Sequence, residues 1–218
     1  MKSILAPLRR VKFQLKLATQ RRRLRALRTG GPARLIIGTS GMGMSEWIGT
    51  DREVLDLTNP ATWEQFFSAD RVDAILAEHV WEHLDLNGAR AAAALCFRFL
   101  KPGGYLRAAV PDGLHPDPAY VEAVKPGGSG WGSDDHRVLY DYRSFSDLFA
   151  GVGFEVRLLE HFDESGKFVQ QLWHPADGKI RRSSRYDERN TVKPLTYTSV
   201  ILDAVKPCPP GQKARTAT

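Results

Sequence analysis

Short apolar runs alternate along the chain with segments that carry helix signals, and this pattern predicts a sheet with interleaved helices. The expected strands are short and almost wholly apolar, as buried parallel strands are, and they span residues 34–38, 72–77, 105–110 and 154–159. The expected helices have a start signal or an alanine-rich stretch, and they span residues 59–67, 87–100 and 144–150. Strand and helix alternation of this kind is typical of an α/β fold.

Weaker strand signals follow at both sides of this central pattern. Residues 47–51 and 54–56 resemble short extended pieces that each end on a carboxylate. Residues 168–173 and 179–182 predict a hairpin, and residues 196–205 predict a closing strand. We therefore expect a Rossmann-like, mostly parallel sheet with helices on both faces and an antiparallel C-terminal edge.

The N-terminal segment has a different charge from the rest of the chain. Residues 1–34 contain 11 of the 31 Lys and Arg residues and no acid, whereas the remainder has 20 basic and 25 acidic residues. Ile4, Leu8, Val11, Leu15 and Ala18 recur at steps of three and four, which predicts one apolar stripe of a helix. The expected organisation is a basic amphipathic helical arm at 1–31, a domain at 32–207 and a disordered tail at 208–218.

A basic amphipathic helix can lie on an anionic membrane surface, dock on a partner protein or pack on its own domain. We expect the segment 1–29 to contact an anionic membrane or a protein partner, with packing on the domain as the alternative. Nucleic acid is disfavoured because Phe13 is the only aromatic residue of the arm, and one ring provides no platform for stacked bases.

Cysteine content and hydropathy indicate the compartment. The chain has two cysteines, Cys96 and Cys208, which cannot form a disulfide framework and show no zinc-finger spacing. No apolar run approaches the roughly 18 residues of a membrane-spanning helix. A cytoplasmic location is expected, with peripheral attachment at the inner membrane surface as a variant of it.

Polar residues follow the ends of the expected strands, where α/β sheets bind their ligands. Small residues after the first strand let backbone N–H groups approach a ligand closely, and a carboxylate after the next strand can accept both hydroxyls of a ribose. These strand-end residues are Gly38, Thr39, Ser40, Asp51 or Asp56, Glu78, His79 and Asp112.

Several motifs resemble class I S-adenosylmethionine-dependent methyltransferases, and in particular small bacterial predicted methyltransferases with an SEHxxEHL-like segment. The matching segments are Leu-Ile-Ile-Gly-Thr-Ser, Glu-Trp-Ile-Gly-Thr-Asp, Ala-Glu-His-Val-Trp-Glu-His-Leu, Leu-Lys-Pro-Gly-Gly before a strand, and a late His-x-x-x-Tyr-Asp. The resemblance covers about residues 34–162. It implies S-adenosylmethionine as the cofactor and methylation of an oxygen or nitrogen of a small-molecule or glycan-type acceptor.

The resemblance also assigns roles to individual positions. Gly38, Thr39 and Ser40 would pass close to the methionine end of the cofactor, and Asp51 would hold the ribose hydroxyls. Asp56 and Leu57 would flank the adenine, and Glu78 and His79 would close the pocket. Methyl transfer needs alignment of a nucleophile, with optional help from a base. The candidates for that help are His136 and Asp112, because the Gly- and Pro-rich excursion at 113–142 is expected to cover the cofactor mouth as a lid.

Two other classes of function stay open. His79, Glu82 and His83 satisfy H-x-x-E-H, the inverted zinc-protease pattern, for which Glu155 could supply a third ligand. Only residues 39–46 separate the first two expected strands, whereas a parallel crossover normally needs a dozen or more residues. A methyltransferase-like protein that binds without catalysing is therefore the second alternative. A dinucleotide oxidoreductase is disfavoured because the glycines at 38–43 have the wrong offsets for G-x-G-x-x-G, and no metal is assigned to the favoured site.

Overall fold

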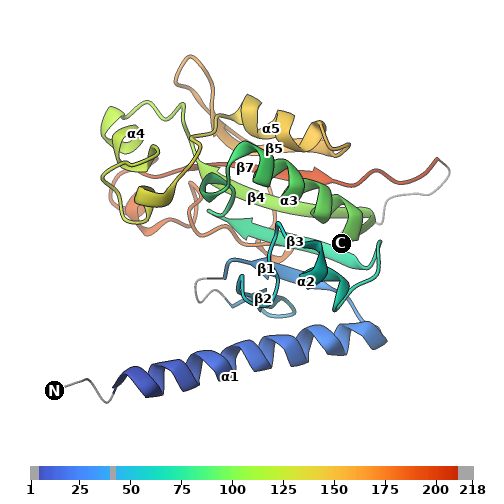
Figure 1. Cartoon of the computed structure of the whole chain (residues 1–218). Coiled ribbons are helices and arrows are strands. Elements are labelled where there is room, and N and C mark those ends of the chain that lie inside the picture. Colours follow the sequence, from blue (N-terminus) through green and yellow to red (C-terminus); the bar gives the residue numbers. More distant parts are fainter. Residues whose placement is uncertain (1–4, 40–42, 211–218) are drawn as a thin grey trace.

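The computed structural model describes residues 5–39 and 43–210, and its centre is one seven-stranded sheet in the order β2-β1-β3-β4-β7-β5-β6 (Figure 1). The strands are β1 (Arg34–Ile37), β2 (Ile48–Thr50), β3 (Val72–Glu78), β4 (Leu100–Pro111), β5 (Glu155–Phe162), β6 (Phe168–Gln170) and β7 (Ser199–Val205).

Strands β2, β1, β3 and β4 are all parallel to one another, which confirms the mostly parallel α/β sheet. β6 pairs antiparallel with β5 and forms the expected antiparallel edge. The closing strand β7 is also antiparallel, but it lies inside the sheet, between β4 and β5. The chain runs from β1 outward to β2 and then back past β1 to β3. This reversal makes the gap between β1 and β3 the topological switch point of the sheet.

The described part of the chain has five α-helices beside the sheet, namely α1 (Leu5–Ala26), α2 (Pro60–Glu64), α3 (Leu86–Phe99), α4 (Pro118–Val124) and α5 (Tyr142–Ala150). Their starts follow capping chemistry, because the Asn59, Asp85 and Asp141 side chains each accept a hydrogen bond from a backbone N–H of the first turn. Ser144, which the sequence suggests as the cap of α5, is instead the N3 residue of a capping box in which Asp141 is the N-cap.

The two faces of the sheet are covered differently. On one face, α2, α3 and α5 pack on the strands and enclose the main core, which includes Trp63, Phe99 and Phe145. On the other face, a smaller cluster of strand residues packs against Trp47, Trp173 and Ile180, none of which is in an α-helix. The expected α-helices are therefore found on one face. The second face is covered by the segment 171–186, whose helical part is the 3-10 turn Pro175–Asp177. Residues 179–182 form no strand, so the expected second arm of the hairpin is wrong, and the hairpin present is β5–β6.

A buried ion pair holds this covering segment on the sheet. Arg107 of β4 stands directly opposite Asp203 of β7, and its guanidinium donates to both carboxylate oxygens at 2.7 and 2.8 Å. The same guanidinium donates to the backbone carbonyls of His174 and Gly178 at 3.2 and 3.0 Å, and it lies over the ring of Trp173. Burial lowers the pKa of Arg107, but the contact with Asp203 outweighs burial and keeps that pKa above its usual value.

The basic arm is helical, as expected, but the buried face differs from the predicted stripe. Leu17, Gln20 and Leu24 are buried, so the C-terminal half of α1 packs against the domain near β2 (Figure 1). Val11 and Leu15 are 56% and 62% exposed and face away from the core. Two further members of the stripe, Ile4 and the side chain of Leu8, lie outside the described part. Within the described residues, no helix combines the length and the apolar character needed to cross a membrane.

Three smaller expectations have mixed outcomes. β1 and β2 are parallel neighbours although only residues 38–47 connect them, so the first crossover is short and the two strands were correctly predicted. Residues 54–56 form no strand, and Val54 belongs to a turn. Residues 208–210 have no regular structure, and the rest of the predicted disordered tail lies outside the described residues.

Candidate functional site

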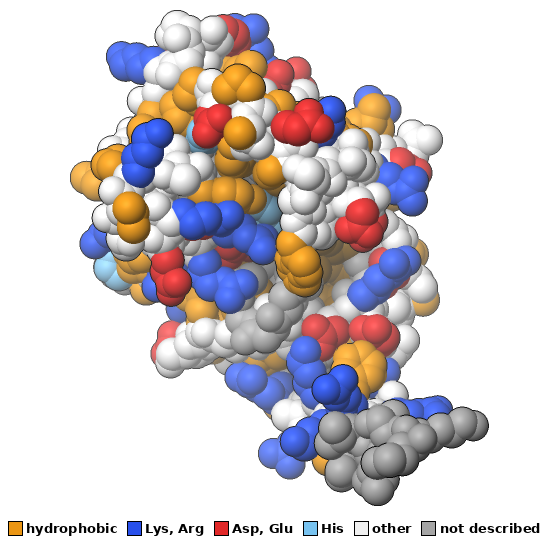
Figure 2. Space-filling model, turned by 90° about the vertical axis from the view of Figure 1, so that its left-hand side faces the viewer, with side chains coloured by type: hydrophobic (Ala, Val, Ile, Leu, Met, Phe, Trp, Pro, Cys, Tyr) orange, Lys and Arg blue, Asp and Glu red, His pale blue; other side chains and the backbone are white. Residues whose placement is uncertain are grey.

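A cavity of about 520 Å³ opens at the carboxyl ends of β1 and β3, which is the switch point of the sheet. Gly38 lines it from the end of β1, and Glu78 and His79 line it from the end of β3. Figure 2 shows Lys and Arg side chains gathered on this side of the molecule, around a hollow in which a histidine is visible. The volume of this cavity falls within the roughly 300–1,000 Å³ of typical small-molecule sites.

The first predicted cofactor residues meet at the end of β1. Gly38 has φ +64°, and a Cβ atom there would stand 2.9 Å from a methyl group of Val80, so glycine is favoured by both conformation and space. The backbone N–H groups of Gly38 and Thr39 both donate to the Thr50 carbonyl at the end of β2. Ser40 lies outside the described residues, so its predicted contact with the cofactor stays a prediction.

Asp51 follows β2 and is engaged by the chain itself. Thr39 Oγ1 donates to its Oδ1 at 3.1 Å, Gln20 Nε2 donates to its Oδ2 at 2.9 Å, and Lys16 Nζ lies 2.6 Å from Oδ2. Burial raises the pKa of Asp51, but hydrogen bonds from Lys16, Gln20 and Thr39 outweigh it and hold the pKa below its usual value. The carboxylate is ionised and partly exposed, and α1 occupies one of the oxygens that a ribose would need.

The structure keeps Asp56 and Leu57 apart from this site. The Asp56 carboxylate accepts from the backbone and hydroxyl of Thr58 and from Arg52, which makes it a turn former, whereas Leu57 is buried in the main core. Although burial raises the pKa of Asp56, the bonds from Thr58 outweigh it and keep the pKa low. Neither residue lines the cavity within the described part of the chain, so an adenine contact stays a prediction.

Glu78 and His79 are buried at the end of β3. The Glu78 carboxylate accepts from the backbone N–H groups of Arg181 and Arg182 at 3.1 and 2.9 Å, which fixes the covering segment to the strand end. His79 has the left-handed φ of 54°, and its Nε2 lies 3.0 Å from the hydroxyl oxygen of Ser199 on β7. Burial lowers the pKa of His79 well below its usual value, so the ring is neutral at pH 7.

The two catalytic candidates lie in different surroundings. Asp112 is fully buried at the end of β4, and its oxygens accept from the backbone N–H groups of Leu114 and Phe162 at 2.9 and 2.7 Å. Burial raises its pKa to about 6. These bonds tie β4 to β5 and give Asp112 a structural role outside the described cavity lining. His136 does line the cavity, and its Nδ1 lies 2.7 Å from the Val124 carbonyl oxygen.

The excursion at 113–142 forms one wall of the cavity. The wall consists of the end of α4, the loop Gly130–Gly132 and the 3-10 turn Ser133–Asp135, followed by His136. Arg137 N donates to the Glu82 carbonyl at 2.6 Å, which attaches the excursion to the turn after β3. Trp131 is 97% exposed at this wall. The predicted excursion therefore lies beside the strand ends, as the expected covering element would.

The H-x-x-E-H pattern is present without the helix that a zinc protease needs. His79 has a left-handed backbone, and Trp81–His83 form a 3-10 turn, so the two histidines do not share a helical face. Glu155 begins β5 opposite Val205, at the far end of the sheet from the cavity. The inverted zinc-protease arrangement with Glu155 as a ligand is therefore wrong for this chain.

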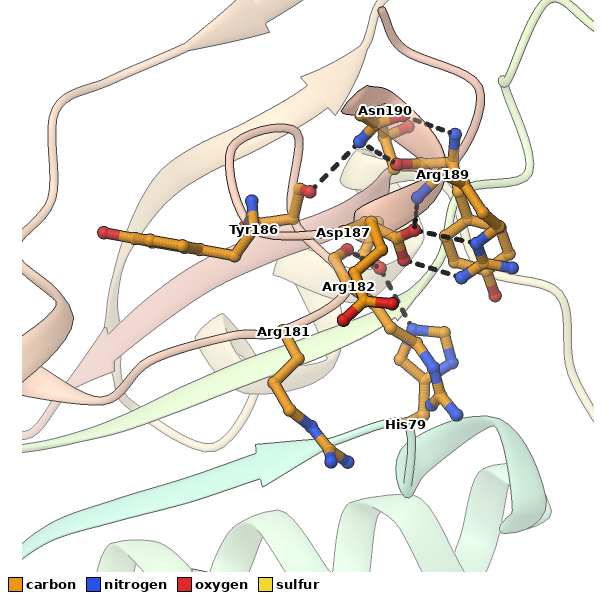
Figure 3. Close-up of polar contacts among 12 residues, drawn as sticks. His79, Arg181, Arg182, Tyr186, Asp187, Arg189 and Asn190 are labelled. Atoms are coloured by element: carbon orange, nitrogen blue, oxygen red, sulfur yellow. Dashed lines mark hydrogen bonds and ion pairs between the residues drawn. The ribbon is translucent and has the colours of Figure 1, made fainter. Parts of the chain in front are cut away.

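Glu82 and three arginines are functional candidates that strand-end reasoning missed. Glu82 is 1% exposed, and burial raises its pKa to about 7. Arg181, Arg182 and Arg189 line the opposite wall, and Figure 3 shows Arg182 beside His79 with Arg181 extending in the same direction. The guanidinium Nη2 of Arg189 lies 2.6 Å from Oδ2 of Asp187. The sequence contains the adjacent pair Arg181-Arg182, but this pair is far from the strand motifs along the chain. Its position over the strand ends could therefore not be predicted.

Comparison with known proteins gives similarity only at the level of solved structures. No family model and no curated protein matches the sequence. The chain is similar to a SAM-dependent methyltransferase from Archaeoglobus fulgidus, with 16% identity over 88% of this chain and 94% of that chain and a TM-score of 0.47. An S-adenosylmethionine-dependent methyltransferase from Mesorhizobium loti is 11% identical over 84% of this chain and 96% of that chain, with a TM-score of 0.47. A SAM-dependent methyltransferase from Thermotoga maritima is 15% identical over 91% of this chain and 96% of that chain, with a TM-score of 0.45.

Proposed function

We propose that this protein transfers a methyl group from S-adenosylmethionine to an oxygen or nitrogen of a small-molecule or glycan-type acceptor. The observation that carries the proposal is the position of the cavity, at the switch point between β1 and β3, with Gly38 among the residues that line it. Open α/β sheets bind their ligands at this point. The motifs that resemble those of methyltransferases lie at these same strand ends, and they are the reason for proposing S-adenosylmethionine as the ligand.

The fit of the cofactor differs between its two ends. Gly38 permits close approach of the methionine end, and the guanidinium groups of Arg181 and Arg182 provide positive charge for its carboxylate. We assign the ribose hydroxyls to Asp51, which lies outside the described lining of the cavity and would have to be released by Lys16 and Gln20. When bound, the cofactor supplies an electrophilic methyl on a sulfonium. The chain's part is to align the acceptor and exclude water.

His136 is our candidate for accepting the acceptor's proton. Its Nδ1–H donates to the Val124 carbonyl, which leaves Nε2 as the ring nitrogen available to accept a proton in the cavity wall. The exposed indole of Trp131 at the same wall offers an apolar face to an acceptor. These two residues support an acceptor of modest size that enters along the excursion 113–142.

We also propose that α1 associates with an anionic membrane surface. The exposed side chains Val11 and Leu15 lie on a helix whose charged residues are all basic, which is the charge pattern that anionic lipid attracts. The protein would then act in the cytoplasm at the inner membrane surface, where a glycan-type acceptor on a lipid carrier could reach the cavity.

A binding protein without catalytic activity is the second candidate. The observation in its favour is that Asp51 and Glu78, two predicted cofactor residues, already have partners within the chain. Such a protein would hold a ligand in the cavity and leave it unchanged.

Calorimetric titration tests the proposal directly. S-adenosylmethionine and S-adenosylhomocysteine should each bind the full chain once, and Asp51→Asn should weaken both at least tenfold because it removes the charge that faces the ribose. Glu53→Gln is the matched control, since it removes an acid from an exposed position two residues away. Absence of binding to the folded wild-type protein would refute the methyltransferase and leave the binding protein. Binding without methylation of any acceptor would also favour the binding protein.

A further inference from the structure

Three metal-ligating side chains from two separate segments meet on one wall of the cavity. Glu82 and His83 belong to the 3-10 turn after β3, and His136 follows the 3-10 turn Ser133–Asp135 of the excursion. One candidate ligand atom from each of the three lies within 4.8 Å of the other two. We propose that Glu82, His83 and His136 bind a divalent first-row transition-metal ion such as Zn²⁺.

Both histidines are oriented by the kind of contact that metal-bound histidines make. The Nδ1 of His83 lies 2.7 Å from the Asp135 carboxylate, and the Nδ1 of His136 lies 2.7 Å from the Val124 carbonyl oxygen. Both partners are acceptors, so each Nδ1 is the donor and each Nε2 is the ring nitrogen available to a metal ion. A ligating histidine almost always donates its other ring N–H to a carboxylate or a carbonyl, which fixes the tautomer.

The Glu82 carboxylate is the second and independent observation. Its side chain is buried, and neither carboxylate oxygen accepts a hydrogen bond from the described residues. An ionised carboxylate that is buried without a donor is strongly disfavoured, because it loses its hydration and gains no hydrogen bond or counter-charge. Since Glu82 lines the cavity beside both histidines, a cation there would supply the missing partner.

His79 lies beside the Glu82 carboxylate. The Ser199 hydroxyl donates its proton to the Arg182 carbonyl at 2.8 Å, so Ser199 accepts from the Nε2–H of His79. His79 Nδ1 lies 3.1 Å from Glu82 Oε1, and these two atoms form a hydrogen bond only when a proton is present between them. A proton on Glu82 or on His79 Nδ1 is therefore the competing explanation, and it predicts no metal binding.

The spacing is that of an open site which contracts on binding. Ligand bonds of about 2.0–2.1 Å in tetrahedral geometry place donor atoms about 3.4 Å apart, compared with the upper limit of 4.8 Å observed. The side chain of His83 is 33% exposed and can rotate to close this difference. Two imidazoles and one carboxylate favour Zn²⁺, Co²⁺ or Fe²⁺, whereas Mg²⁺ prefers oxygen ligands and octahedral geometry.

Three protein ligands leave a coordination position open toward the cavity. A metal ion there would bind an oxygen of the acceptor and lower the pKa of its hydroxyl, which favours the nucleophilic form. In the metal-bound protein Nε2 of His136 would be a ligand, so this lowering of the hydroxyl pKa would take the place of proton transfer to His136. This role in catalysis rests on the proposed function, whereas metal binding itself does not.

The test is titration of metal-free full-length protein with ZnCl₂ and CoCl₂, followed by calorimetry and by visible absorption of bound Co²⁺. We expect one ion per chain and a Co²⁺ spectrum of a four- or five-coordinate site. His136→Ala and Glu82→Gln should each weaken Zn²⁺ binding at least tenfold. His174→Ala is the matched control, because it removes an exposed imidazole outside the cavity and should leave affinity unchanged.

Two results would overturn the proposal. The first is that the folded wild-type protein binds no equivalent of either ion, which would assign the Glu82–His79 contact to a proton. The second is that His136→Ala, at a half-buried position where misfolding is not expected, binds as tightly as the wild type. S-adenosylmethionine titrated into the metal-free protein measures the proposed function separately, so that failure of one proposal is distinguishable from failure of the other.

Discussion

Removing Asp203 should destabilise the protein strongly, because it leaves the Arg107 guanidinium buried without its counter-charge. The Arg107 side chain is 3% exposed and donates to both Asp203 oxygens. Loss of one partner of a buried ion pair typically costs about 3–5 kcal/mol. This is a large share of the roughly 5–15 kcal/mol by which a domain is stable. We expect Asp203→Ala to lower the free energy of unfolding by about 3–5 kcal/mol.

Chemical denaturation followed by circular dichroism and tryptophan fluorescence measures this loss. The matched control is Glu64→Ala, which breaks the ion pair with Arg98 in which both side chains are about half exposed. Exposed pairs contribute about 0–1 kcal/mol. If Asp203→Ala costs no more than the Glu64 control, the buried pair does not stabilise this sheet and the reasoning is refuted.

A second variant separates the ion pair from the anchoring of the covering segment. Arg107→Met removes the donor to the His174 and Gly178 carbonyls, whereas Asp203→Ala leaves that donor in place. Limited trypsin digestion should therefore cut the segment 179–185 faster in Arg107→Met than in Asp203→Ala. Equal rates would show that the two carbonyl contacts do not hold the segment.

Three further predictions concern the arm and the end of β4. Lys16→Ala should raise affinity for S-adenosylmethionine about two- to fivefold by calorimetry, because the partly exposed contact with Asp51 competes with the ribose; unchanged affinity would contradict competition. Burial raises the Asp112 pKa from 3.8 to about 6, so its contribution to stability is full below pH 3.8 and is lost as pH rises through 6. Thermal unfolding of the wild type and Asp112→Asn should therefore diverge between pH 4 and 7, and parallel profiles would oppose this. The double variant Val11→Ser and Leu15→Ser should sediment with anionic vesicles at least tenfold more weakly than the wild type; a wild type that does not sediment would remove the membrane proposal.

Local signals in the sequence predicted most of the sheet but could not predict how its faces are covered. Apolar runs bounded by Gly or a carboxylate predicted β1, β3 and β4, and the Asn59-Pro60 signal predicted the start of α2. The covering segment 171–186 is held in place by hydrogen bonds with Arg107 and Glu78, two residues that are remote from it in the sequence. Its position therefore does not depend on a periodic pattern of its own. Long-range polar anchors leave no periodicity for a sequence pattern to detect.

The candidate site was predicted in the same uneven way. Gly38, Glu78, His79 and His136 were predicted from strand ends and the excursion, and all four line one cavity. Asp51 was placed correctly after β2, but its contacts with α1 could not be foreseen, because the predicted stripe of α1 used Val11 and Leu15 rather than Leu17. The helix presents similar apolar content on two faces, so tertiary packing decides which face is buried.

The location of β7 bears on how the protein reaches its native state during synthesis. Its two neighbours, β4 and β5, precede it in the chain, so both keep an unpaired edge until residues 199–205 have left the ribosome. Exposed strand edges promote aggregation. A nonsense mutation just before β7 would therefore yield a chain that holds most of the domain's residues yet accumulates as insoluble material.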